Sequence, residues 1–287
     1  MHILILGGTR FFGKHAVRTA LERGHQVTIA TRGLTADDFG DAVQRIHLDR
    51  NDPASLRENL SGRHFDAVID NLCYCSNDVR NLLNVLDCGR YVMTSTTAVY
   101  DKHWDTCESE FDPLSKPLEW RDRSAYPYEE VKRLAECALF QQYPQMNAVA
   151  VRYPFVIGMD DYTNRLRFYV EHALRGIPMH IDNIDRQMGF IHSNEAGAFL
   201  VHMAENDFRG SINGCSAGTI SLAEILAYVQ EKTGRTAILS PGGDAAPYNG
   251  ENEYSINTSL AEQTGFTFSP LKPWIFALLD HYIDQFC

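Results

Sequence analysis

Short apolar runs alternate with amphipathic stretches of helical period through the first half of the chain. The apolar runs lie at 3–6, 26–30, 66–70 and 91–95, and the helical patterns lie at 14–23 and 76–86. Parallel strands joined by helices produce this alternation, and strands buried on both faces read as nearly continuous apolar runs. The sequence therefore predicts an α/β fold, a Rossmann-type doubly wound parallel sheet.

The same pattern continues past residue 150 and then changes. A helix over 126–141 and a strand over 148–153 extend the sheet, and a mixed order follows: helices over 165–175, 195–204 and 221–233, and a short strand over 189–192. Ser221 with Glu224 three residues later forms a capping-box signature at the start of the last of these helices. We expect a Rossmann domain over residues 1–158, to which segments near 189–215 return, and a smaller C-terminal α/β lobe over 159–287.

Composition narrows the class of partner. The 287 residues are 44% hydrophobic, enough for a large core, and the formal net charge of -11 opposes binding to nucleic acid. No run of about 18 apolar residues and no signal-peptide pattern is seen, which predicts a cytoplasmic protein that binds no membrane. An odd number of cysteines predicts free thiols rather than a disulfide framework: Cys73, Cys75, Cys88, Cys107, Cys137, Cys215 and Cys287.

A glycine-rich loop leaves the first apolar run and opens the first helix. It reads Gly7, Gly8, Thr9, Arg10, Phe11, Phe12 and Gly13. Glycine permits a tight turn and lets backbone N–H groups approach a pyrophosphate at the positive end of the helix. The loop therefore predicts dinucleotide binding, although Arg10 occupies the place of the middle glycine in the common Gly-x-x-Gly-x-x-Gly spacing.

The end of the second predicted strand indicates which dinucleotide is preferred. An acidic residue there would accept from the ribose hydroxyls of NAD, but the chain carries Thr31 and Arg32. Arg32, helped by Arg10, could bind a 2′-phosphate through two hydrogen bonds, which favours NADP over NAD; the alternative is a solvated loop arginine. Asp49, at the end of the third expected strand, either accepts from the adenine amino group or caps the next turn.

Tyr128 and Lys132 are four residues apart on a predicted helix and so share a face. An ammonium group favours the phenolate and lowers the pKa of a tyrosine toward the range useful in acid–base catalysis. A tyrosine and a lysine at this spacing are common by chance. The motif gains weight from the hydroxyl-rich segment 92–100, which ends a strand about thirty residues upstream.

Together these segments resemble the extended short-chain dehydrogenase/reductase superfamily, the NAD-dependent epimerase/dehydratase group. The resemblance covers the glycine loop, the segment 92–100, Tyr128 with Lys132, the segment 152–158 and the segment 190–192. It implies hydride transfer between a substrate carbon and nicotinamide, coupled to proton transfer at Tyr128.

The resemblance also assigns roles to individual residues. It implies that Thr96 orients the substrate oxygen and that Lys132 holds the nicotinamide ribose, with Thr97 on the substrate. The remaining residues that it places along the cofactor are Leu72, Cys73, Thr94, Tyr153, Phe155 and Val156.

Three positions depart from the pattern of the superfamily. Dehydratases carry Asp-Glu where this chain has Thr97 and Ala98, which argues against sugar dehydration. Many nucleotide-sugar epimerases carry Asn where this chain has Phe155, which puts a nucleotide-sugar substrate in doubt. The loop with Arg10 is also similar to a subgroup that includes plant plastid stem-loop RNA-binding proteins.

Two hypotheses for function follow. The first is an NAD(P)-dependent oxidoreductase or epimerase acting on a small hydroxylated or carbonyl, sugar-like substrate, with Arg165 available to an anionic group. The second is a non-catalytic cofactor-binding member of the same fold, RNA-associated or redox-sensing. The residues predict no metal site, and the resemblance implies a homodimer formed through the helix that carries Tyr128.

Overall fold

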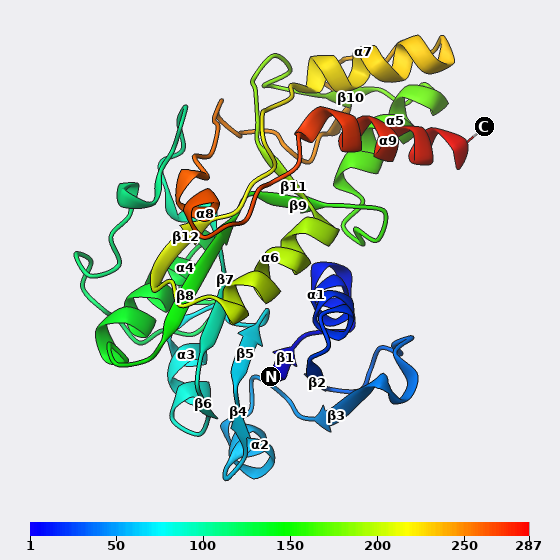
Figure 1. Ribbon diagram of the computed structural model, residues 1–287. Helices are drawn as coiled ribbons and strands as arrows, with labels where there is room; N and C mark the ends of the chain where they lie inside the picture. Colours follow the sequence, from blue (N-terminus) through cyan, green and yellow to red (C-terminus); the bar gives the residue numbers. More distant parts are fainter. Residues whose placement is uncertain (287) are drawn as a thin grey trace.

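A parallel sheet of seven strands forms the centre of the computed structural model, which describes residues 1–286 (Figure 1). The strands follow the order β3-β2-β1-β5-β7-β8-β12, and every neighbouring pair is parallel. Their bounds are β1 His2–Leu6, β2 Gln26–Thr31, β3 Val43–His47, β5 Ala67–Asp70, β7 Tyr91–Thr96, β8 Ala148–Tyr153 and β12 Gly210–Asn213. The predicted Rossmann-type α/β fold is confirmed.

Three further pairs of short strands lie outside this sheet. They are β4 His64–Phe65 with β6 Asp87–Cys88, β9 Phe155–Ile157 with β11 Phe190–His192, and β10 Met179–His180 with β13 Asp244–Ala245. The segment expected as a strand over 189–192 is therefore β11, which pairs with β9 and not with the large sheet.

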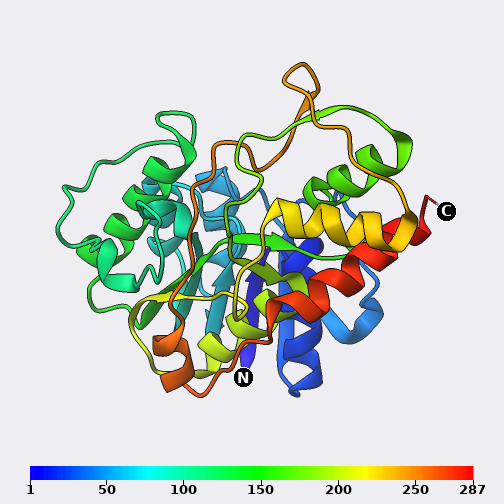
Figure 2. The ribbon, with the colours of Figure 1, turned by 90° about the horizontal axis from the view of Figure 1, so that it is seen from above.

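Helices cover both faces of the sheet and build the C-terminal part (Figures 1 and 2). Their bounds are α1 Phe11–Glu22, α2 Pro53–Leu60, α3 Ser76–Leu83, α4 Tyr128–Cys137, α5 Arg165–Arg175, α6 Ser193–Glu205, α7 Leu222–Thr233, α8 Ser259–Gln263 and α9 Leu271–Asp284. Short 3-10 turns occupy Gly40–Ala42, Thr97–Val99 and Glu108–Glu110, and a π-helical turn occupies Ala138–Gln142.

Three apolar clusters hold these layers together. Helices α1 and α6 pack on one face of the sheet, and α2, α3 and α4 pack on the other. The third cluster joins α5, α7 and α9 at the top of Figure 1, beyond the carboxyl ends of the strands. Helix α6 and strand β12 come after α5 in the sequence, but they return to the sheet, where β12 pairs with β8. The division at residue 158 remains a prediction.

Local signals explain where two helices begin. Helix α7 starts after Ser221, whose hydroxyl accepts from the N–H of Glu224 while the Glu224 carboxylate accepts from the N–H of Ser221. Helix α4 starts at Tyr128, two residues later than the expected 126, because Pro127 caps it in an extended conformation. A residue that precedes proline is disfavoured in helical geometry, so Tyr126 stays outside the helix.

A buried ion pair fixes α4 to the sheet. Arg152 on β8 and Glu136 on α4 are both fully buried, and Nε of Arg152 donates to the two carboxylate oxygens at 3.0 and 3.1 Å. Arg152 also donates to the Tyr100 hydroxyl at 2.7 Å and to the carbonyl of Phe111 at 3.0 Å. Since Tyr128 and Lys132 lie on the same helix as Glu136, this network sets their position relative to the strand ends.

Among residues 1–286, no helix combines the length and the apolar character needed to cross a bilayer. The cysteines within that range are free thiols, and Cys287 lies outside the described residues.

Candidate active site

The glycine loop joins β1 to α1 in a tight turn. Gly7 has φ +82°, a left-handed conformation that favours glycine. A Cβ added to Gly13 would lie 2.2 Å from the carbonyl oxygen of Gly7, and one added to Gly8 would lie 2.8 Å from Val17. These contacts show that glycine is required for the close approach of helix and strand.

Arg10 is accommodated at the middle position of the fingerprint. Its backbone is extended, with φ -137° and ψ 150°, which any residue adopts. The left-handed conformation falls instead on Phe11, with φ 51°, an uncommon value for a bulky side chain. The exposed side chain of Arg10 turns aside, and its Nε donates to Thr35 Oγ1 at 3.2 Å. Arg10 therefore leaves the loop's close turn intact.

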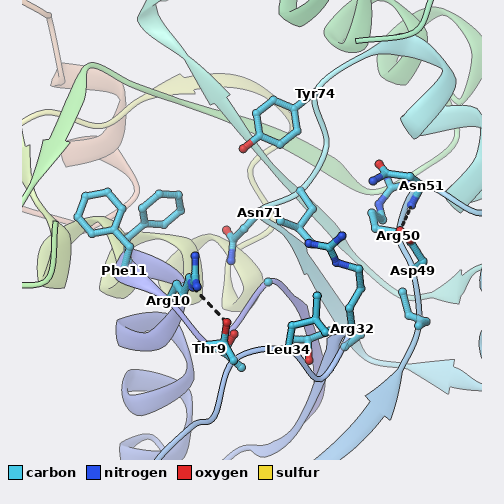
Figure 3. Close-up of a pocket in the computed structure, with 18 of the residues that line it drawn as sticks. Thr9, Arg10, Phe11, Arg32, Leu34, Asp49, Arg50, Asn51, Asn71 and Tyr74 are labelled. Atoms are coloured by element: carbon cyan, nitrogen blue, oxygen red, sulfur yellow. Dashed lines mark hydrogen bonds between the residues drawn. The ribbon is translucent and has the colours of Figure 1, made fainter. Parts of the chain in front are cut away.

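A first pocket of about 440 Å³ opens above this loop at the carboxyl ends of β1, β2 and β3. Asp49, Arg50 and Asn51 lie together at one end of it, and Arg10 and Phe11 lie at the other (Figure 3). Its lining includes these predicted cofactor residues: Gly7, Thr9, Arg10, Phe11, Phe12, Gly13, Thr31, Arg32, Asp49 and Leu72.

Buried donors without partners face this pocket. Asn71 follows β5, and its Oδ1 accepts from Thr94 Oγ1 at 2.8 Å, whereas its Nδ2 has no partner within residues 1–286. A buried N–H group left unpaired is costly, so native proteins rarely leave one without a ligand or water. The glycine loop and the free amide of Asn71 fit a dinucleotide, whose phosphates and ribose oxygens are acceptors.

A second pocket of about 480 Å³ adjoins the first, and Phe11, Phe12, Asn71, Tyr74 and Tyr162 line both. It brings together predicted residues from four separate segments of the chain: Thr94, Thr96, Thr97, Tyr128, Lys132, Tyr153, Phe155, Val156 and Arg165. The residues that line both pockets make them one continuous surface.

Lys132 is held in a fixed position. It is 3% exposed, and its Nζ donates to the carbonyls of Cys73 at 2.6 Å and Thr94 at 2.8 Å. The third N–H of the ammonium remains for a ligand. Lys132 Nζ lies 6.0 Å from the ring centre of Tyr128, which is 48% exposed at the start of α4. A rigid cation thus stands beside an accessible phenol.

Tyr74 is a second phenol at this place. Its ring centre lies 4.8 Å from Lys132 Nζ, and the guanidinium of Arg123 stacks over it at 3.2 Å. In Figure 3 the hydroxyl of Tyr74 points into the space between Phe11 and Asn71. No periodic pattern in the sequence singles out Tyr74 or Arg123, which lie on loops.

The far end of the second pocket carries charge around an aromatic ring. Lys102 Nζ and the guanidinium of Arg165 lie 5.6 and 5.0 Å from the ring centre of Phe155. Lys102 also pairs with Glu251 at 2.5 Å, and Arg165 Nε donates to Thr163 Oγ1 at 2.9 Å. Arg165 has no carboxylate within ion-pair distance in the described chain, so it can receive an anionic or hydroxyl group.

A few predicted residues contribute without lining either pocket. Gly8 lies behind the loop against α1, and Cys73 contributes its carbonyl oxygen to Lys132. Burial raises the pKa of the Cys73 thiol well above its usual value, so the thiol stays protonated. Asp49 Oδ1 accepts from the N–H of Asn51 at 2.9 Å, so Asp49 caps the turn, one of the two roles expected for it. Asp49 also lines the first pocket.

The comparisons with known proteins agree with this geometry. A model of the NAD dependent epimerase/dehydratase family matches residues 3–76. The structure of MoeE5 in complex with UDP-glucose and NAD superposes with a TM-score of 0.75 at 18% identity, covering 99% of each chain. The UDP-glucose 4-epimerase of Thermotoga maritima, with UDP-glucose, gives a TM-score of 0.75 at 16% identity, covering 99% of each chain. Residues 3–76 thus match this family, and the whole chain shares the fold of these structures.

Two curated relatives are similar in sequence. The chloroplast stem-loop binding protein of 41 kDa b from Arabidopsis thaliana is 35% identical over 131 residues, which are 40% of this chain and 35% of that protein. The 2'-dehydrokanamycin reductase of Streptomyces kanamyceticus is 24% identical over 209 residues, 72% of this chain and 59% of the reductase. The matches thus span only about a third and three fifths of these relatives' lengths.

Several residues that line the two pockets were not predicted from the sequence. Arg50 and Asn51 directly follow Asp49, and Asn71 directly follows the buried end of β5, so their places in the chain were signals. Lys102 and Glu251, by contrast, are about 150 residues apart and meet only through tertiary packing. Within residues 1–286, no group of three or more His, Cys, Asp or Glu side chains could hold a metal ion.

Gly13→Ala is expected to weaken the binding of a reduced nicotinamide dinucleotide by roughly tenfold or more, because the new Cβ would lie 2.2 Å from the Gly7 carbonyl oxygen and would push α1 away from the loop. Nicotinamide fluorescence of the reduced cofactor measures the affinity. Gly242→Ala is the matched control, since no atom lies within 4 Å of its added Cβ. Unchanged affinity in Gly13→Ala would contradict the assignment of the loop.

Proposed function

We propose that the protein is an NAD(P)-dependent oxidoreductase or epimerase that acts on a small hydroxylated or carbonyl, sugar-like substrate. The observation that carries this proposal is the convergence of Thr96, Tyr128 and Lys132 on one pocket that adjoins the pocket of the glycine loop. Side chains from the end of a strand and from the helix α4 meet there. A structural or purely binding role does not require an accessible phenol beside a buried ammonium.

Each group has a distinct task in the proposed reaction. When bound, the nicotinamide ring supplies the acceptor or donor of a hydride. The Tyr128 hydroxyl takes the proton from the substrate alcohol or returns it to the carbonyl oxygen. Lys132 places its charge beside the phenol and offers its free N–H to the cofactor ribose, and Thr96 orients the substrate oxygen. These tasks are the same in reduction and in epimerisation.

The substrate end supports a sugar-like ligand. Thr97, Thr163 and Arg165 line the same pocket as Phe155, and the guanidinium of Arg165 lies 5.0 Å from the centre of its ring, on which an apolar face of a sugar could pack. The similarity to 2'-dehydrokanamycin reductase favours the reduction of a ketone on a sugar ring. The UDP-glucose in the similar structures favours epimerisation of a nucleotide sugar. Because Phe155 replaces the asparagine common in nucleotide-sugar epimerases, we place reduction first.

We further propose that the preferred cofactor is NADP. Arg32 is exposed at the mouth of the first pocket, beside Thr31 at the end of β2, and no acidic side chain follows this strand before Asp37. A guanidinium at this place can form two hydrogen bonds to a 2′-phosphate, whereas NAD presents only hydroxyls there.

Arg32→Ala tests both the cofactor and its preference. We expect the wild type to bind NADPH more tightly than NADH, and the variant to lose roughly tenfold or more in NADPH affinity, the worth of a charge-assisted hydrogen bond, with little change for NADH. Arg57→Ala is the control, because Arg57 is exposed on α2 and lines neither pocket. Tighter binding of NADH by the wild type would refute the preference. Binding of neither cofactor would refute the proposed function.

A second candidate function is an RNA-associated module that binds the cofactor without turnover. The 35% identity to a chloroplast stem-loop binding protein favours it, although the net charge of -11 opposes RNA binding. Salt-sensitive RNA binding that Tyr128→Phe leaves unchanged, together with no turnover in a screen of carbonyl substrates with NADPH, would place this function first. Homodimerisation through α4 and its neighbour α3 remains a prediction of the resemblance.

A further inference from the structure

The loop over residues 158–164 joins β9 to α5 and reaches the passage between the two pockets. Tyr162 on this loop lines both pockets, and within residues 1–286 the other residues that line both follow β1 and β5. The ring of Tyr162 lies edge-on to that of Phe11, with 6.0 Å between the ring centres, and the guanidinium of Arg10 lies 6.0 Å from the centre of the Tyr162 ring. Tyr162 is 65% exposed, so its ring forms the outer wall of the passage.

The loop is held by the carboxylate of Asp160. Its Oδ2 lies 2.9 Å from Nε2 of His15 on α1, and its Oδ1 accepts from Oγ of Ser193, the first residue of α6, at 2.9 Å. Helices α1 and α6 pack closely, since a Cβ added to Gly197 on α6 would lie 2.5 Å from the backbone of α1. Asp160 therefore ties the loop to a rigid pair of helices, of which α1 follows the glycine loop.

The contact between Asp160 and His15 depends on the charge of the histidine. Burial raises the pKa of the Asp160 carboxyl, but the hydrogen bonds with His15 and Ser193 outweigh this effect and leave that pKa below its usual value. Asp160 is therefore ionised near neutral pH. Because histidine gains and loses its proton in this range, the contact changes between an ion pair and a neutral hydrogen bond.

The other groups around this contact do not change their charge near neutral pH. Burial and the charge of His15 lower the pKa of His192, whose Nδ1 accepts from the N–H of Asn194, so His192 stays neutral. Tyr282 on α9 donates to the carbonyl of Gly158 at 3.0 Å, and burial raises the pKa of Tyr282 to about 12. The charged neighbours along α1, the loop and the start of α6 are already engaged: Lys14 and Arg18 with Asp38, Asp161 with Thr163, and Glu195 with Ser216 and Ser269.

We propose that Asp160 and His15 are positioning residues, which hold the ring of Tyr162 against Phe11 so that it retains a bound cofactor in the passage between the pockets. This inference rests on the proposed function. Tyr162 contacts the ligand, and the other two residues act through it. Protonation of His15 strengthens its contact with Asp160, so the cofactor should leave more slowly at lower pH.

The first test measures how fast NADPH leaves its complex with the protein, or NADH if that cofactor binds more tightly. Excess oxidised cofactor displaces the reduced one in a stopped-flow experiment, and nicotinamide fluorescence reports the rate. Tyr162→Ala is expected to raise the dissociation rate roughly fivefold, the worth of an aromatic contact. Asp160→Asn is expected to raise it roughly two- to fivefold, the range of a partly exposed ion pair. In both variants, acrylamide should quench the bound nicotinamide more strongly.

Two variants are matched controls for this test. Met159 is 65% exposed on the same loop and lines neither pocket, so Met159→Ala should release the cofactor at the wild-type rate. Asp87 forms an exposed contact with His64 at 3.0 Å, so Asp87→Asn should do the same. Wild-type rates in Tyr162→Ala or in Asp160→Asn would overturn the proposal and leave the proposed function intact. If the wild type binds neither cofactor, the proposed function itself fails.

The second test isolates the proton on His15. The dissociation rate of the wild type is expected to rise roughly two- to fivefold between about pH 6 and 8, as His15 loses its proton and the ion pair is lost. His15→Gln keeps an N–H donor beside Asp160 but does not titrate, so its rate should not share this rise. Both proteins bind the same cofactor, whose own titration cancels in the comparison. An equal rise in both would overturn the role of His15.

Discussion

Tyr128→Phe is expected to lower turnover by roughly two to four orders of magnitude, the usual contribution of a positioned general acid or base. The affinity for NADPH should change little, because the phenol is 48% exposed and its removal takes a single oxygen from the surface of α4. Steady-state kinetics with the carbonyl substrate found in the screen, together with a fluorescence titration of the cofactor, separate the two effects.

Two neighbouring tyrosines are the controls for this variant. Tyr126 is 39% exposed, lies two residues before Tyr128 and lines neither pocket, so Tyr126→Phe should keep full turnover. Tyr74→Phe is the sharper comparison, because the ring of Tyr74 is nearer to Lys132 than that of Tyr128, 4.8 against 6.0 Å. If Tyr74→Phe loses turnover while Tyr128→Phe retains it, the proton transfer belongs to Tyr74 and the role proposed for Tyr128 is wrong.

Arg152→Met is expected to lower the free energy of unfolding by about 3–5 kcal/mol, the cost of leaving one member of a buried ion pair without its partner. Glu136 would remain fully buried and unbalanced, with only hydroxyl donors such as Ser211 at 2.9 Å. Because Glu136 lies on α4, we also expect weaker cofactor binding through displacement of Lys132. Urea unfolding measures the stability, and the cofactor titration measures the displacement.

A double variant separates the pair from the packing of its side chains. Arg152→Met with Glu136→Met removes both charges, and it should recover a substantial part of the lost stability, since apolar replacements of buried pairs are often neutral or stabilising. Arg121→Ala is the surface control: its partner Glu119 and Arg121 itself are each 46% exposed, and exposed pairs contribute at most about 1 kcal/mol. If Arg152→Met and Arg121→Ala lower the free energy of unfolding equally, burial of the Arg152–Glu136 pair does not add to its contribution to stability.

Local sequence patterns were sufficient where neighbours along the chain decide the structure. The apolar run 3–6 is a fully buried strand, the helix expected over 165–175 is α5, and the capping box at Ser221 begins α7. The spacing of four residues between Tyr128 and Lys132 placed both at one site for the same reason, because a helix repeats every 3.6 residues. Such features depend on periodicity and on caps, which are written within a few residues.

The parts that the sequence did not show depend on contacts between distant segments. Strand β12 lies within the segments near 189–215 that were expected to return to the Rossmann domain, but its partner was not predicted. It pairs with β8 although about 60 residues separate them, and a four-residue run carries too little pattern to reveal that partner. The Asn71 Nδ2 that has no partner within residues 1–286 and the stacking of Arg123 on Tyr74 arise from single loop residues, which follow no periodic pattern.

By itself, then, the sequence of this protein determined the alternation of strands and helices through the first half of the chain, the close turn of the glycine loop and the position of Tyr128 and Lys132 on one helix, all of which follow from short-range backbone geometry. Only the tertiary structure decided which side chains close the two pockets and which buried donors remain unpaired. Burial depends on everything that packs around a residue, and those neighbours come from elements far apart in the chain.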